Sequence, residues 1–351
     1  MDINMNQSSA RNQAYDLMRI VAALSVIVMH VTVNNMYSSP MESAKWVGSM
    51  ALNSVSHFGV PVFVMISGAL FLAPNREPDI KRIWLHNILR MSIVLIVWSV
   101  FYGVTDYLEY RAEPVFIVRE IIDGRQHLWF IPMLLGLYMI QPILLRWLKS
   151  ASVKEVRYFL LMFLCLGVVW ESLRSYEISG VIEHLDKFRE VELFCSYAGY
   201  FVAGYYIAHI GLSQKTRIVL YALGFISFLT LPVVSVYVSR YRQIPSTAFS
   251  DSFSVFVCMF SAALFIAVSE YSRKKKISGI SAGIISELGL DTLGVYLCHI
   301  ALMERIPILR DWCDMLPSVI GMLIYSIILF GIGSIISAVL RRIPVIGRYI
   351  C

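Results

Sequence analysis

Long apolar runs separated by short polar segments repeat along the whole chain. Each run has about 18 or more residues, which is the length that an α-helix needs to cross roughly 30 Å of hydrocarbon. The short alternating segments of a membrane β-barrel do not occur. Because backbone groups in lipid must form their hydrogen bonds internally, the runs predict about ten transmembrane helices. The predicted spans are 17–36, 53–73, 88–106, 128–148, 156–173, 192–210, 216–238, 253–270, 284–304 and 318–340.

The composition supports an all-α integral membrane protein. Hydrophobic residues make up 58% of the chain and charged residues 15%, whereas a soluble domain has about 25% charged residues. No Gly/Ser-rich linker or low-complexity tract interrupts the pattern, so we expect a single membrane domain over residues 1–351. The six cysteines form no CxxC pair, and four of them fall inside apolar segments. We therefore predict no metal site.

The distribution of basic residues predicts the orientation. With the N-terminus in the cytoplasm, 18 of the 30 Lys and Arg residues lie on the inner side, 11 lie on the outer side, and Arg19 lies within the first span. The positive-inside rule then places both termini in the cytoplasm. The same rule explains the net charge of +6 without a nucleic-acid partner. The outer segments 107–126 and 174–191 have mixed charge and are either the rim of an acceptor site or solvated loops.

Two polar residues in the first span are costly in hydrocarbon and therefore mark a candidate site. Arg19 and His30 are 11 residues apart. That separation is within about 20° of three whole turns, so both side chains lie on one helix face, roughly 16 Å apart along the axis. Alternatively, both residues have only structural roles: Arg19 reaches toward lipid phosphates, and His30 hydrogen-bonds to a neighbouring helix.

Three further histidines fall in the outer half of the membrane under the predicted topology. His127 opens the fourth span and His299 lies in the ninth. His57 lies near the start of the second span and is the weaker candidate, since it can serve there simply as a cap. Several imidazoles at one depth favour a shared chemical role over isolated structural ones.

Five segments carry a resemblance to a known family. They are Arg19 with His30, the stretch 60–68 (VPVFVMISG), Arg90, the stretch 127–130 (HLWF) with Tyr138 and Pro142, and the stretch 293–299 (LGVYLCH). Together they resemble the membrane-bound acyltransferase 3 family, including its R-x10-H first helix. Within that family the chain is most similar to the stand-alone branch that includes the enterobacterial common antigen O-acetyltransferase. One departure is Asn87, where many members have a second arginine three residues before Arg90.

The resemblance implies a multi-pass protein of the plasma (inner) membrane that transfers an acyl group from acyl-CoA. Acetyl-CoA is the expected donor because it is the common one, and succinyl remains open. The acceptor would be a hydroxyl of a surface or lipid-linked saccharide. Coenzyme A is polyanionic, which suits a set of basic residues on the inner side. The donor-binding candidates are Arg90, Arg82 and Lys81.

The resemblance also implies that His30 is the centre of the chemistry. An imidazole can deprotonate a sugar hydroxyl or carry the acyl group itself near neutral pH. The sequence contains no G-x-S-x-G elbow that would support a soluble-type esterase. The catalytic candidates are His30, Arg19, His127 and His299.

Two other classes of function remain open from the sequence. A transporter or flippase built on the same membrane domain would use intramembrane charges to line a permeation path. A scaffold subunit of a polysaccharide-synthesis complex would need no chemistry at all. Transfer of a labelled acyl group by the purified protein would favour the enzyme, whereas movement of unmodified substrate would favour transport.

Overall fold

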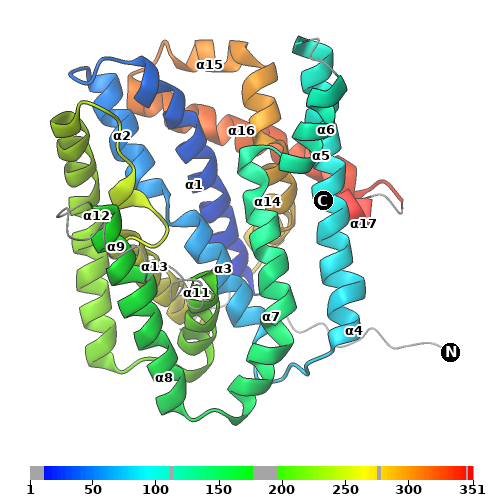
Figure 1. Cartoon of the computed structure of the whole chain (residues 1–351), viewed down its shortest axis with the longest axis vertical. Helices are drawn as coiled ribbons and strands as arrows, with labels where there is room; N and C mark the ends of the chain where they lie inside the picture. Colours follow the sequence, from blue (N-terminus) through cyan, green and yellow to red (C-terminus); the bar gives the residue numbers. More distant parts are fainter. Residues whose placement is uncertain (1–11, 111–113, 177–195, 275–277, 345–346, 351) are drawn as a thin grey trace.

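The computed structural model is a bundle of helices that run mostly along one axis (Figure 1). It describes residues 12–110, 114–176, 196–274, 278–344 and 347–350, and these contain no strand. Helices α6 and α15 lie at one end of the bundle and α4 lies at the other (Figure 1). We refer to the end at which α1 begins as the inner end, because the charge distribution predicts that it faces the cytoplasm.

The helices follow one another with short connections. The first half of the chain forms α1 (Gln13–Ser38), α2 (Ala44–Ser56), α3 (Gly59–Phe71), α4 (Ile80–Arg82), α5 (Leu89–Tyr110), α6 (Pro114–Asp123), α7 (Phe130–Ser150), α8 (Val153–Met162) and α9 (Trp170–Ser175). The second half forms α11 (Ser196–Tyr205), α12 (Gln214–Arg242), α13 (Val255–Lys274), α14 (Ile280–Arg305), α15 (Pro307–Cys313), α16 (Ser318–Arg341) and α17 (Gly347–Ile350). Short π-helical or 3₁₀ turns join several of them: η1 (Ile83–Ile88), η2 (Gln126–Trp129), η3 (Phe163–Val169), η5 (Tyr206–Ile210) and η6 (Ala248–Ser250).

The predicted fold class is confirmed. Within the described residues, nine helical runs are long and apolar enough to cross a membrane. They coincide with nine of the ten predicted spans. In the remaining span, 192–210, the first four residues lie outside the described residues, and the rest form α11 and η5 over Ser196–Ile210. The orientation of the bundle in the membrane remains a prediction.

The second span begins earlier than the hydropathy pattern predicts. Helix α2 begins at Ala44 rather than near residue 53, and the Ser43 hydroxyl caps it by accepting the Trp46 backbone N–H at 3.1 Å. Trp46 is fully buried and its indole N–H donates to the Met36 carbonyl at 3.0 Å. Residues 44–52 thus belong to the same apolar helical run as the residues that follow and pack against the end of α1.

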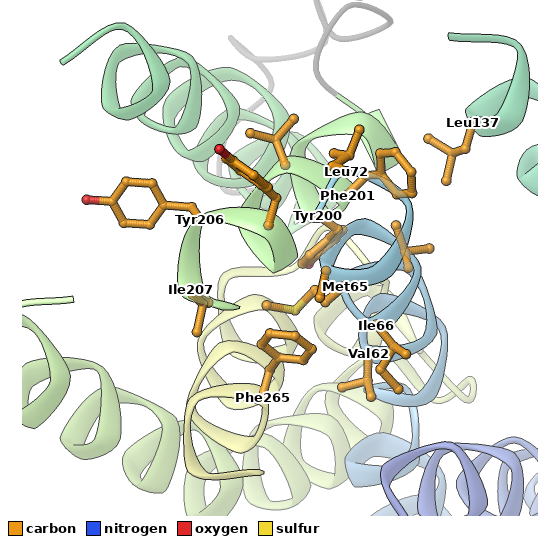
Figure 2. Packing of buried hydrophobic residues seen from close by; sticks show 14 of the residues in the cluster. Val62, Met65, Ile66, Leu72, Leu137, Tyr200, Phe201, Tyr206, Ile207 and Phe265 are labelled. Carbon is orange, nitrogen blue, oxygen red and sulfur yellow. The ribbon is translucent and has the colours of Figure 1, made fainter. Parts of the chain in front are cut away.

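Helices α3 and α11 approach each other closely because glycine lies at each contact. A Cβ atom at Gly68 would lie 1.8 Å from the Phe201 carbonyl oxygen, and one at Gly204 would lie 2.0 Å from the Met65 carbonyl oxygen. Small residues at such contacts let membrane helices pack through their backbones. Figure 2 shows Met65 and Phe201 within the apolar cluster that surrounds this contact.

Helix α1 occupies the middle of the bundle, where it packs against α2, α3, α13, α14 and α16 (Figure 1). A central position places its polar face toward protein rather than lipid, which is where intramembrane charges are tolerated. Of the two outer segments, 107–126 is largely helical, because α5 extends to Tyr110 and α6 follows it. Most of the other segment, residues 177–191, lies outside the described residues.

Candidate active site

The polar face of α1 opens onto a cavity of about 580 Å³ inside the bundle. Arg19 and His30 both line this cavity, as their shared helix face predicts. Arg19 donates to the Asp16 carboxylate at 2.6 Å, and that carboxylate is fully buried. We call this space the histidine cavity. Its polar lining residues are Arg19, His30, Ser56, His57, Ser67, Arg90, Gln126, His127, Tyr138, Tyr197, Asp251, Ser252, Thr292 and Tyr296.

Three imidazoles from three separate elements meet at one wall of the histidine cavity. The rings of His30 and His299 have centroids 5.1 Å apart, and those of His127 and His299 have centroids 5.4 Å apart. His299 is fully buried and lies behind the other two, whereas His30 and His127 line the cavity itself. The sequence candidates in α1, η2 and α14 are therefore brought together, but only two of them can touch a ligand in this cavity.

The tautomer of His299 follows from its hydrogen bond. Its Nδ1 lies 2.6 Å from the Tyr296 carbonyl oxygen, and a carbonyl can only accept, so Nδ1 carries the proton. In the neutral ring Nε2 is then an acceptor. Among the described residues, Nε2 of His299 has no hydrogen-bond partner. This buried acceptor belongs to a ring whose centroid is 5.1 Å from that of His30.

His127 is held from several sides. The Tyr102 ring packs edge-on against it with centroids 5.1 Å apart, and the Tyr296 hydroxyl donates to its backbone carbonyl. Two residues earlier, Arg125 donates to Asp106 of α5 at 2.9 Å and to Glu304 of α14 at 3.1 Å. These contacts join the turn that carries His127 to both neighbouring helices.

His57, the weaker candidate from the sequence, also lines the histidine cavity. The Asn53 amide donates to the Met29 carbonyl and to Thr32 Oγ1, each at 3.0 Å. Its oxygen must therefore accept from His57 Nε2, which lies 3.1 Å away. The neutral His57 ring then keeps its lone pair on Nδ1. The spacing of Asn53 and His57 at i and i+4 on one helix face was the signal available in the sequence.

The predicted donor-binding residues separate into two groups. Arg90 lines the histidine cavity together with Arg19. Lys81 and Arg82 lie on α4 at the inner end, are exposed, and do not line that cavity. The structure thus brings one of the three donor-binding candidates to the histidines and leaves two of them outside the cavity.

This arrangement can carry out proton transfer or group transfer on a hydroxyl. Imidazoles that line a cavity can take a proton from a bound hydroxyl, or can attack an acyl carbon themselves. Arg19 and Arg90 place two guanidinium groups along the same space, which suits an anionic substrate. The apolar remainder of the lining, which includes Met29, Phe63 and Leu134, limits the access of water to such chemistry.

One of three comparisons with known proteins produced a match. Residues 12–342 match the family model described as an acyltransferase domain. The match includes every candidate site residue named above. Neither the comparison with curated proteins nor that with solved structures produced a match.

Proposed function

Because this chain belongs to the acyltransferase 3 family of multi-pass membrane proteins, we propose that it is an acyl-CoA-dependent O-acyltransferase of the plasma (inner) membrane. Its acceptor would be a hydroxyl group of a surface or lipid-linked saccharide, and acetyl-CoA is the expected donor. The resemblance to the branch that includes the enterobacterial common antigen O-acetyltransferase supports a surface-polysaccharide acceptor.

One observation carries the proposal: a single cavity holds both imidazoles and arginines inside the membrane-spanning bundle. His30 and His127 line it together with Arg19 and Arg90. Arg19 and His30 are 11 residues apart on α1, so basic and imidazole groups are separated by roughly 16 Å along the helix axis. A donor that enters from the inner end can therefore reach an acceptor at the histidines through one space.

The proposed chemistry assigns the proton transfer to His30. Its imidazole removes the proton from the acceptor hydroxyl while the hydroxyl oxygen bonds to the thioester carbonyl carbon. The carbon–sulfur bond then breaks, and the imidazolium returns the proton to the leaving thiolate. In the covalent variant, the imidazole nitrogen bonds to the acyl carbon while the carbon–sulfur bond breaks and the thiol of coenzyme A leaves with the proton of the imidazole. In a second step the acceptor oxygen bonds to the acyl carbon, the carbon–nitrogen bond breaks, and the imidazole takes up the proton of the hydroxyl. In both variants His299 orients the His30 ring from the side away from the cavity, and His127 contacts the acceptor.

The test is acyl transfer from labelled acetyl-CoA to a lipid-linked saccharide by purified protein in detergent or vesicles. His30→Ala should lower transfer by at least about 10²–10⁴-fold, the usual loss for a general base, while thermal unfolding and acetyl-CoA binding stay near those of the wild type. His86→Ala is the matched control, because His86 is exposed near the inner end. Normal transfer by each of the variants His30→Ala, His127→Ala and His57→Ala would refute the assignment of the chemistry to these histidines. No transfer by the wild type, together with movement of unmodified substrate, would refute the enzyme and favour the transporter.

A further inference from the structure

Two further cavities lie between the histidine cavity and the inner end of the bundle. The middle cavity, of about 570 Å³, lies between the beginning of α1 and the ends of α3, η5 and α13. The inner cavity, of about 490 Å³, lies between α8, η5, α12 and α13. Arg19 lines both the histidine cavity and the middle cavity. Arg273 and Ser269 line both the middle and the inner cavity. The three spaces therefore follow one another through shared walls.

The middle and inner cavities are rich in arginine. Their basic lining residues are Arg19, Arg76, Arg157, Arg217 and Arg273. The acidic ones are Asp16 and Glu270, each of which is ion-paired with one of these arginines. Five positive charges against two negative charges leave a formal excess of three. The arginines come from separate elements, so their convergence is a property of the fold rather than of one basic stretch of sequence.

The arginines of the inner cavity are held in place by protein contacts. Arg157 of α8 donates to the Tyr206 hydroxyl at 2.7 Å. Arg273 of α13 donates to the Ile207 carbonyl at 3.0 Å. Arg217 of α12 is ion-paired with Glu270. A guanidinium fixed in this way presents its remaining face to the cavity in a set direction, which suits a multiply charged phosphate.

We propose that the inner cavity binds the phosphate groups of the acyl-CoA donor, the 3′-phosphate in particular, through Arg157, Arg217 and Arg273. The pantetheine arm then follows the middle cavity past Arg19, and its thioester enters the histidine cavity. This inference rests on the proposed function and names the part of the molecule that selects its donor. It also replaces the expected contribution of Lys81 and Arg82, which line none of the three cavities.

The inference predicts which donors each variant can use. Steady-state transfer is measured with purified full-length protein and three donors: acetyl-CoA, 3′-dephospho-acetyl-CoA and S-acetylpantetheine. Arg157→Ala and Arg217→Ala should each raise KM for acetyl-CoA by about tenfold or more, the value of one charge-assisted hydrogen bond to phosphate. Neither should change KM or kcat for S-acetylpantetheine, which has no nucleotide. Arg157→Ala keeps the Arg217–Glu270 ion pair, so this variant tests the inference even if Arg217→Ala fails to fold.

Lys215→Ala is the matched control, because Lys215 precedes Arg217 by two residues on α12, is exposed, and lines neither cavity. It should leave KM unchanged for all three donors. Equal losses with all three donors, or an unchanged KM for acetyl-CoA in both arginine variants, would overturn the inference while leaving the proposed function standing. If the wild type transferred from none of the donors, the proposed function itself would fail and the inference with it.

Discussion

Removing the Arg125 side chain should destabilise the outer end of the bundle and misplace His127. Arg125 donates to Asp106 at 2.9 Å and to Glu304 at 3.1 Å. The Asp106 side chain is only 5% exposed, whereas that of Arg125 is 27% exposed. Among the residues that the structure describes, Arg125→Met would therefore leave a buried carboxylate with one remaining cation, Arg305, whose nearest nitrogen is 3.6 Å away.

The expected size of the effect follows from this geometry. Breaking a buried pair by removing one partner costs about 3–5 kcal/mol, because the remaining charge stays buried. Arg305 still compensates part of the Asp106 charge, so we expect a value near the lower end, about 3 kcal/mol. Replacing both partners, in Arg125→Met with Asp106→Leu, removes the orphaned carboxylate. The double variant should therefore be more stable than Arg125→Met alone, although it also lacks the contact between Asp106 and Arg305.

The assay is thermal unfolding of purified variants in one detergent, followed by acyl transfer well below the transition. Arg125→Met should unfold at the lowest temperature, the double variant higher, and the wild type highest. A displacement of His127 by about 1 Å can cost 10²-fold in rate, so kcat should fall by about 10- to 100-fold in Arg125→Met. The control is Arg119→Met, which removes an exposed pair with Asp123 and should cost at most about 1 kcal/mol. A double variant that unfolds at or below the transition temperature of Arg125→Met would refute the reasoning.

Three other changes test separate parts of the structure. Arg90→Ala should weaken acetyl-CoA binding by about 10- to 150-fold, the value of one charge-assisted hydrogen bond to the thioester end of the donor in the histidine cavity, whereas Arg146→Ala should not. Calorimetry measures both, and equal effects would mean that general surface charge draws the donor. Gly68→Ala should lower the unfolding temperature markedly, because its Cβ would meet the α11 backbone at 1.8 Å; an unchanged transition would show that the helices do not pack this closely. Asn53→Leu removes the acceptor that fixes the His57 tautomer, so kcat should fall at least about tenfold while the donor KM changes little. A selective rise in donor KM would instead place His57 in donor binding.

The transmembrane helices could be predicted because hydropathy is a local property of a segment. Nine predicted spans coincide with helices that can cross a membrane. The predicted span 284–304 nevertheless contains two acidic residues, Glu287 and Asp291 of α14. Both are tolerated because Arg341 of α16 donates to Asp291 at 2.9 Å and lies 3.2 Å from Glu287. No local pattern could have shown that pairing, since the partners are about 50 residues apart.

By itself the sequence determined the helical membrane fold, the shared face of Arg19 and His30, and the set of histidines to consider. Helical periodicity and the cost of polar groups in hydrocarbon are sufficient for those conclusions. The tertiary structure decided that His299 lies behind His30, that Asn53 orients His57, and that Lys81 lies apart from the cavities. The physical reason is that lipid gives apolar helices no preference among neighbours, so close packing and polar contacts between distant segments select which faces meet.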